Sequence, residues 1–272
     1  YISGTILFDE TLRQSAKDGT RLADVLKSQN IIPGIKVDTG AKPLAGTDGE
    51  TVTEGLDGLT ERVAEYVELG ARFAKWRAVI TIGDSKPTDY AIRVNAQGLA
   101  RYARICQEGG LVPIVEPEVL MDGSHDINAC QAATERTLNS VFEELYQQGV
   151  ALEGMILKPN MVISGSTCTQ QADADTVAHM TVETLRRCVP VAVPGIMFLS
   201  GGQSEEEATV NLNAMNQKFG PNPWALSYSY GRALQAGALK AWVGKAENES
   251  AAQNVLLARS QANSAACAGK AA

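Results

Sequence analysis

The sequence predicts an α/β protein built as a (β/α)8 TIM barrel that lacks one strand. Short apolar runs alternate with longer amphipathic runs along the chain, which is typical of parallel strands joined by helical crossovers. About seven such units over 272 residues fit a barrel of eight with one unit missing. A doubly wound open sheet is the alternative; it ranks second because no GxGxxG sequence follows a predicted strand.

The strands are predicted from short apolar runs. In chain order they are Ile2–Phe8, Ile32–Val37, Phe73–Ile80, Leu111–Val115, Gly154–Leu157, Gly195–Leu199 and Ala225–Tyr230. The helices are predicted from apolar residues spaced three and four positions apart. They include Leu59–Leu69, Ala91–Gln107, Ile127–Gln147, Ala174–Arg187, Glu205–Met215 and Ala251–Ala262.

Residues 1–272 are interpreted as a single domain, because no low-complexity linker divides them. The sequence opens at Tyr1 without a methionine and enters an apolar run at once, so we expect that the first barrel strand lies upstream. The stretch from Ser264 to Ala272 is rich in Ala, Gly and Lys and is expected to be frayed. The barrel domain is therefore predicted to be incomplete at both ends.

Composition excludes several classes of function. With 24 basic and 31 acidic side chains, the net charge of −7 gives no general attraction for nucleic acid or an anionic membrane. No apolar run is long enough to span a bilayer, and no signal-peptide pattern is present. Five scattered cysteines without a CxxC pair indicate free thiols in a reducing compartment, and we take the cytoplasm as the expected location. Only two histidines, far apart, argue against a transition-metal site.

Lys158 is the most informative single residue. It ends the apolar run Met155-Ile156-Leu157 and precedes Pro159, so it is expected at the carboxyl end of a buried strand. A partly desolvated lysine has a lowered pKa, and its free amine can attack a carbonyl to form a Schiff base. The alternative is a lysine whose head group reaches out to solvent from the strand end.

Other charged residues cluster at the same predicted rim of the barrel, where reactive groups are expected. They lie within the predicted strands or shortly after them, and they are Lys36, Asp38, Lys75, Arg77, Glu116, Glu118 and Arg232. Nearby lysines depress each other's pKa, so Lys75 and Lys36 are expected to favour the neutral amine of Lys158. Glu116 is the candidate acid/base for Schiff-base formation. Glu118 is a second candidate, or a charge partner.

Two anion sites are predicted on this rim. The turn Ser200-Gly201-Gly202 precedes a helix whose N-terminus favours an anion. Arg232 follows the next strand and supplies a fixed positive charge for a phosphate. Lys36 and Arg77 lie on the far side of the rim and can hold a second anion. Two anion sites flanking one amine indicate a bisphosphorylated carbonyl substrate.

These residues fall within longer runs that resemble class I, Schiff-base fructose-1,6-bisphosphate aldolases. The runs extend over nearly the whole length of the chain, in the order and spacing of that family. They are GIKVD (34–38), FAKWR (73–77), VEPE (115–118), LKPNMV (157–162), FLSGGQSE (198–205) and SYSYGRALQ (227–235).

The resemblance implies a role for each matched residue. Lys158 would form the Schiff base, Glu116 would transfer protons, and Lys75 would polarise the reacting hydroxyls. Glu118 is expected as a further catalytic residue, and Asp38 is expected to bind substrate. The residues implied for the C1 phosphate are Ser200, Gly201, Gly202, Ser229, Gly231 and Arg232, while Lys36 and Arg77 would bind the other phosphate. The resemblance also implies a homotetramer, no metal and no cofactor.

The resemblance further implies two features outside the sequence. Members of the family carry an aspartate on the first barrel strand, which deprotonates the C4 hydroxyl, and a C-terminal tyrosine that assists proton exchange. A chain without both is expected to be an open barrel with little cleavage activity. Two alternatives therefore remain: another Schiff-base sugar-phosphate lyase, and a binding or scaffolding protein that keeps the fold without catalysis.

Overall fold

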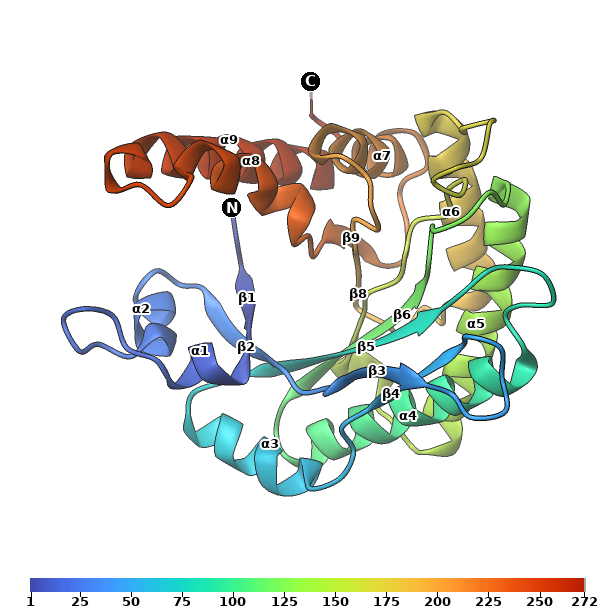
Figure 1. The fold of residues 1–272 in the computed structure, drawn as a ribbon, viewed down its shortest axis with the longest axis horizontal. Coiled ribbons are helices and arrows are strands. Elements are labelled where there is room, and N and C mark those ends of the chain that lie inside the picture. The colour runs from blue at the N-terminus through green and yellow to red at the C-terminus, as the bar shows by residue number, and fades with distance from the viewer. Residues whose placement is uncertain (272) are drawn as a thin grey trace.

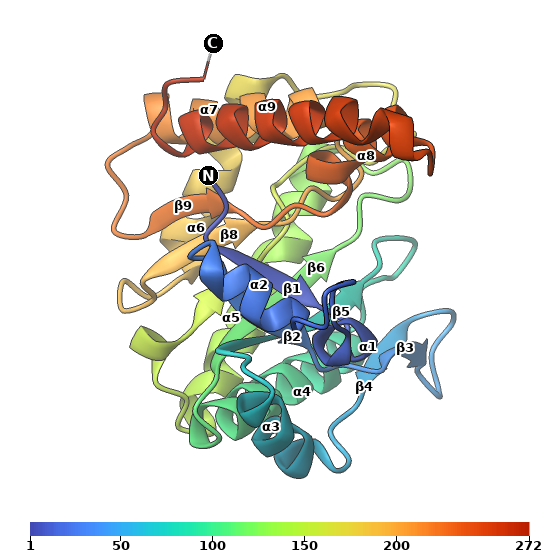
Figure 2. The same ribbon diagram turned by 90° about the vertical axis from the view of Figure 1, so that its left-hand side faces the viewer.

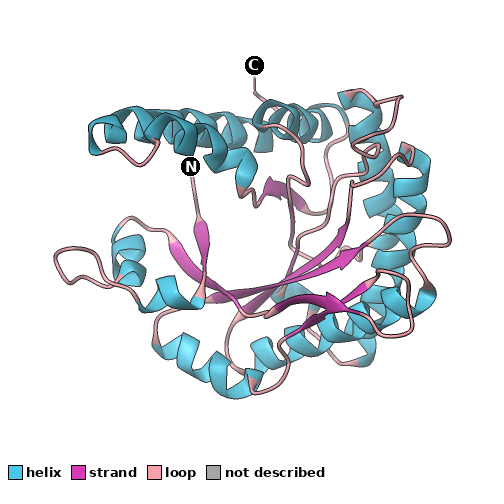
Figure 3. Ribbon diagram, viewed as in Figure 1, coloured by secondary structure: helices cyan, strands magenta, loops and turns pink. Residues whose placement is uncertain are grey.

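A single curved parallel sheet forms the centre of the molecule. The computed structural model describes residues 1–271. Seven parallel strands pair in the order β1-β2-β5-β6-β7-β8-β9. Figure 3 shows the curve of this sheet, with helices around it. Their bounds are β1 Gly4–Leu7, β2 Ile32–Lys36, β5 Phe73–Ile80, β6 Val112–Val119, β7 Ile156–Leu157, β8 Gly195–Phe198 and β9 Ala225–Tyr228. The predicted strand order and parallel direction are confirmed for all seven apolar runs.

Helices follow the outer face of this sheet, as the crossovers require (Figure 1). The longer ones are α3 Leu59–Glu68, α4 Asp89–Glu108, α5 Ile127–Gln147, α6 Ala174–Cys188, α7 Glu205–Lys218 and α8 Arg232–Trp242. A last helix, α9 (Glu249–Cys267), packs on α7 and α8. Side-chain caps begin several of these helices; Thr88, Asp126 and Asp173 each accept from a backbone N–H of the first turn.

The sheet does not close into a cylinder within residues 1–271. Strand β1 pairs only with β2, and β9 pairs only with β8. The N-terminal residue nevertheless reaches the far edge, as the two ribbon views show (Figures 1 and 2). The hydroxyl of Tyr228 donates to the carbonyl of Tyr1 at 3.0 Å, and Gln261 donates to the Tyr1 hydroxyl at 3.1 Å. The sheet is an incomplete barrel, as the sequence predicts.

Several elements escape the sequence prediction. They are two short helices, α1 (Asp9–Arg13) and α2 (Leu22–Ser28), a hairpin of β3 (Gly40–Pro43) and β4 (Thr51–Glu54), and the helix α8. The first four are each seven residues or shorter. Such short segments contain too few residues to show a clear period of either two or 3.6.

The expectation of a frayed C-terminal stretch is wrong for its first part. Helix α9 continues to Cys267, and Ala266 is fully buried. Asn263, which precedes the stretch, is also fully buried and accepts a hydrogen bond from Thr209 of α7 at 2.7 Å. Alanine has the highest helix propensity, and small side chains let α9 approach α7 closely. None of the helices in residues 1–271 has both the length and the apolar character needed to cross a membrane.

Leu157 of the short strand β7 is expected to contribute to stability through its burial in the core. Its side chain is fully buried, between the sheet and the surrounding helices. We expect Leu157→Ala to lower the free energy of unfolding by about 2–5 kcal/mol, because the truncation leaves a cavity. Urea denaturation measures this change. Leu257→Ala is the control, because Leu257 is 49% exposed; a loss at Leu157 no larger than the control's would contradict this packing.

Candidate active site

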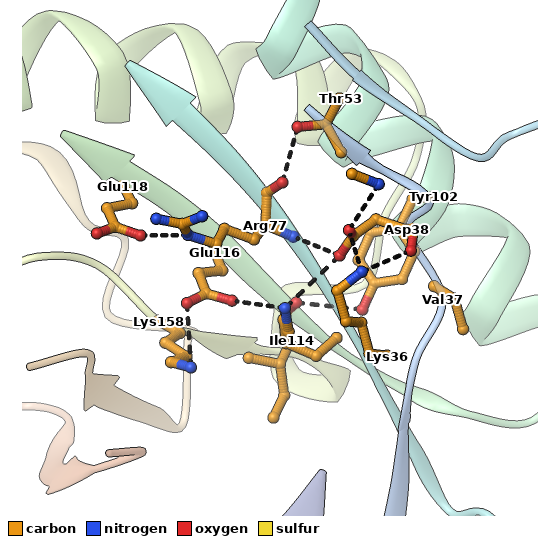
Figure 4. Close-up of polar contacts among 12 residues, drawn as sticks. Lys36, Val37, Asp38, Thr53, Arg77, Tyr102, Ile114, Glu116, Glu118 and Lys158 are labelled. Carbon is orange, nitrogen blue, oxygen red and sulfur yellow. Dashed lines mark hydrogen bonds and ion pairs between the residues drawn. The ribbon is translucent and has the colours of Figure 1, made fainter. Parts of the chain in front are cut away.

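Five charged side chains form one row across strands β2, β5, β6 and β7 (Figure 4). Lys36 contacts Asp38 at 2.6 Å, and Lys75 lies 3.6 Å from the other oxygen of Asp38. Lys75 also lies 3.3 Å from Glu116, whose second oxygen is 3.0 Å from Lys158. Parallel register explains the row, since Lys36 pairs with Lys75 across β2 and β5. The structure thus brings together predicted catalytic and binding residues from four of the predicted strands.

Lys158 is held in a largely desolvated position at the end of β7. Its side chain is 10% exposed, and its ammonium group faces Glu116. Burial lowers the pKa of Lys158, the Glu116 carboxylate opposes that shift, and the Lys75 charge adds to it. The net result is a pKa below the ordinary value of lysine. A larger fraction of free amine is therefore available at a given pH than on a surface lysine, which is what a nucleophile requires.

Glu116 and Glu118 lie within strand β6. The sequence prediction, which ended this strand at Val115 and placed both glutamates after it, is wrong here. Strand β6 runs to Val119, and these residues pair with Arg77 and Val79 of β5. Because side chains two apart share a face, both glutamates point to the same side of the sheet. Glu118 forms an ion pair with Arg77. The polar residues Glu116 and Glu118, with Pro117 between them, concealed the strand, because apolar runs were the signal used to find strands.

Arg77 reaches from this buried row toward solvent. Its side chain is 43% exposed, whereas its partner Glu118 is 10% exposed. Burial is the largest single influence and lowers the pKa of Arg77, but the hydrogen bond to Glu118 together with the charges of Glu118, Glu116 and Asp38 outweighs it, so the pKa is raised. Lys36 is likewise partly exposed, at 26%. These two cations are therefore accessible to an anion that enters from the rim.

Asp38 is enclosed beside the two lysines. Its side chain is 2% exposed, and its two oxygens contact Lys36 and Lys75. The backbone N–H groups of Arg77 and Gly40 donate to it at 3.2 Å each. These contacts occupy both oxygens, so Asp38 orients the two lysines.

The turn after β8 presents backbone donors toward the barrel rim. Gly201 and Gly202 have φ values of +47° and +76°, which glycine adopts without the steric penalty of a side chain. Among the residues that the structure describes, none accepts a hydrogen bond from the N–H of Ser200, Gly201 or Gly202. The turn leads into α7, where Ser204 and Glu207 form a capping box. Free N–H groups beside a helix N-terminus suit an anion.

The second part of this predicted anion site follows β9. Gly231 precedes α8, and Arg232 is its first residue. Both residues are exposed, and Ser229 is half-buried. The N–H of Ser229 donates to the carbonyl of Phe198 at 2.9 Å, which extends the β8–β9 ladder and sets the two turns side by side.

Some residues that shape the site carry no sequence signal of function. Arg62 of α3 donates to the carbonyl of Val37 at 2.9 Å and also to Gly55, so it fixes the chain after β2. Thr53 of the unpredicted hairpin donates to the carbonyl of Arg77 at 2.8 Å (Figure 4). Both act on the backbone, where side-chain patterns give no indication. No group of three or more metal-binding side chains occurs among residues 1–271.

Known proteins resemble this chain over its whole length. A family model described as glycolytic fructose-bisphosphate aldolase class-I matches residues 1–272. The cytosolic fructose-bisphosphate aldolase 4 of Arabidopsis thaliana is 58% identical over 269 residues, which cover 99% of this chain and 68% of that one. Fructose-bisphosphate aldolase 1 of Toxoplasma gondii is 58% identical over 272 residues, which cover 99% of this chain and 75% of that one.

A solved structure gives the same result in three dimensions. It is a ternary complex of fructose-bisphosphate aldolase from Plasmodium falciparum with TRAP and a small-molecule inhibitor. It superposes with a TM-score of 0.98 at 56% identity, covering 100% of this chain and 78% of the other. The sequence runs and the curved parallel sheet agree with this likeness. The chain therefore belongs to the class I fructose-bisphosphate aldolase family.

Proposed function

We propose that this aldolase cleaves fructose 1,6-bisphosphate reversibly through a Schiff base on Lys158. The observation that carries the proposal is the 3.0 Å contact between Lys158 Nζ and Glu116, in a position where the lysine pKa is lowered. The neutral amine attacks the C2 ketone to give a carbinolamine. Glu116 lies where it can donate the proton that leaves with water, which produces the iminium ion.

The iminium ion then serves as an electron sink. Cleavage of the C3–C4 bond, with loss of the C4 hydroxyl proton, releases glyceraldehyde 3-phosphate and leaves an enamine on Lys158. Protonation of the enamine and hydrolysis release dihydroxyacetone phosphate and restore the amine. Lys75 lies between Asp38 and Glu116, at 3.6 Å and 3.3 Å, and is placed to polarise substrate hydroxyls.

The substrate is bound through its two phosphates. One phosphate is assigned to the turns after β8 and β9, where Ser200, Gly201, Gly202, Ser229, Gly231 and Arg232 supply N–H groups, hydroxyls and a guanidinium. The other is assigned to Lys36 and Arg77, the two partly exposed cations on the far side of the same rim. One phosphate group is therefore bound on each side of the C3–C4 bond that is cleaved.

Borohydride trapping tests the proposed chemistry. Incubation with dihydroxyacetone phosphate followed by borohydride reduces an iminium to a stable amine, and peptide mapping locates it. We expect a single adduct on Lys158. An adduct elsewhere, or no adduct, would contradict the mechanism, and no adduct is the result that a non-catalytic scaffolding protein predicts.

Arg232→Ala tests the assignment of the C1 phosphate. A charge-assisted hydrogen bond contributes about 1.5–3 kcal/mol, so half-saturation of trapping by dihydroxyacetone phosphate should require about 10- to 100-fold more ligand. The rate at saturation should change little, because Arg232 does not contact the reacting carbon. Arg93→Ala, an exposed change on α4, is the control. Equal half-saturation in the two variants would remove Arg232 from the binding site.

We also propose a cytosolic location and a homotetrameric assembly. The cytosolic isozyme of Arabidopsis thaliana among the relatives supports the location. The assembly is proposed by analogy with the family. Light scattering coupled to size-exclusion chromatography measures the mass in solution, and a monomeric mass would contradict the tetramer.

A further inference from the structure

Strand β7 is too short to hold Lys158 by backbone pairing alone. It consists of two residues, and its register with β6 covers only Ile114–Ile156 and Val115–Leu157. One further bond follows, from the N–H of Lys158 to the carbonyl of Val115 at 2.8 Å. Lys158, directly after β7, is therefore the last residue of this segment whose backbone is bonded to β6.

Pro117 explains why this ladder stops. Consecutive residues of a strand direct their backbone groups to opposite neighbours, so Val115, Pro117 and Val119 of β6 face β7. Proline has no N–H to donate. The next donor on this side is Val119, and its N–H donates to the side chain of Asn160 at 3.0 Å. The Asn160 amide thus replaces the missing backbone partner, two residues after Lys158.

The other end of the Asn160 amide is fixed as well. Its NH2 group donates to the hydroxyl of Thr134 at 3.1 Å and to the carbonyl of Met161 at 3.0 Å. Asn160 is 5% exposed and Thr134 is 2% exposed. A buried amide with all these bonds made has one orientation, and breaking one bond leaves a buried group without a partner. This network joins β6 and α5 to the chain directly after Lys158.

We propose that Asn160 is a positioning residue for Schiff-base chemistry, which holds the Lys158 backbone so that the amine stays buried within reach of Glu116. This inference rests on the proposed role of Lys158. Asn160 touches neither substrate nor the amine, and it acts through the chain segment 158–160. Without it, only one backbone bond to β6 would hold Lys158 beyond β7. A small displacement of a reacting group has a large effect on rate.

Two measurements on Asn160→Ala test this role. The first is acetylation of Lys158 by acetic anhydride as a function of pH, read by peptide mapping, which needs no sugar phosphate. Because burial is the main cause of the lowered pKa, we expect the midpoint to move to higher pH when the segment loosens. The second is borohydride trapping with dihydroxyacetone phosphate, which should slow by about 10- to 100-fold at unchanged half-saturation.

Asn95→Ala is a matched structural control. Asn95 is also a buried amide, 3% exposed, and it accepts from Thr53 and donates to Thr51 and Ala91 at 2.8–3.2 Å. It joins α4 to the hairpin, and none of these hydrogen bonds involves β7 or the segment 158–160. We expect it to lower stability to a similar degree without moving the acetylation midpoint of Lys158. The same midpoint in both variants would overturn the proposal.

Thr134 allows a conservative rescue. Thr134→Val removes the acceptor of the Asn160 amide, and Thr134→Ser keeps a hydroxyl there. We expect the valine variant to shift the midpoint in the same direction as Asn160→Ala, and the serine variant to restore it; a shift in both or in neither would contradict the network. If the variants shift the acetylation midpoint of Lys158 as expected but the parent chain traps no ligand there, the proposed function fails, while the structural part of the inference, that Asn160 keeps the Lys158 amine buried, stands.

Discussion

Substitution of Lys158 by methionine is expected to abolish covalent trapping of dihydroxyacetone phosphate and to lower the rate of cleavage by at least about 10³-fold. Methionine has a similar length and no amine, so it removes the nucleophile while largely filling the same space. Trapping with mass measurement of the intact protein, together with a coupled cleavage assay, gives the two values. Persistent labelling of the variant would mean that another lysine carries the reaction.

The same substitution should change how stability depends on pH. Because the pKa of Lys158 is lowered by folding, the unfolded chain binds more protons between the folded pKa and the ordinary value of about 10.4. The free energy of unfolding therefore rises with pH in that window. In Lys158→Met this contribution disappears. Lys17→Met, at an exposed loop position, is the control and should keep the rise.

Glu116→Gln is expected to separate amine reactivity from proton transfer. The Glu116 charge raises the pKa of Lys158 and the Lys75 charge lowers it, so loss of the carboxylate should lower that pKa further. The acetylation midpoint of Lys158 then moves to lower pH. Trapping nevertheless slows by about 10²- to 10⁴-fold, because glutamine cannot transfer the proton during carbinolamine dehydration.

The glutamine variant should also be less stable. It leaves Lys75 and Lys158 beside a neutral amide in a place where their side chains are 9% and 10% exposed. Breaking a buried ion pair costs about 3–5 kcal/mol, which urea denaturation can measure. Glu118→Gln is the comparison, because Glu118 contacts Arg77 and not Lys158. Equal loss of trapping in both variants would remove the special role of Glu116.

The sequence predicts the barrel well because its strands are buried on both faces. Such strands are nearly continuous apolar runs, and the run from Phe73 to Ile80 matches β5 residue for residue. The prediction ends too early in β6, whose second half contains Glu116, Pro117 and Glu118. The interior of an active-site barrel must hold charged groups that an ordinary core excludes, and with a proline between them no apolar run marks this half of the strand.

Site residues could be predicted by type and position, but their partners could not. Lys158 and Glu116 can be recognised from the sequence motifs that contain them. The contacts of Asp38 with both Lys36 and Lys75 cannot, because they depend on the register of β2 with β5. Asn160 lies next to Pro159 in a recognised motif, yet its function depends on Pro117 in another strand. Pro117 was the available signal, since a proline inside a central strand implies a gap in the ladder.

The row from Lys36 to Lys158 also has a consequence for electroneutrality. It contains three amino groups and two carboxylates, each carboxylate lying between two amines. With every lysine protonated, this enclosed row carries one uncompensated positive charge. Loss of the proton from Lys158 removes it and leaves two cations against two anions. The form of the site that is ready to react is therefore also the form in which the row is electrically balanced.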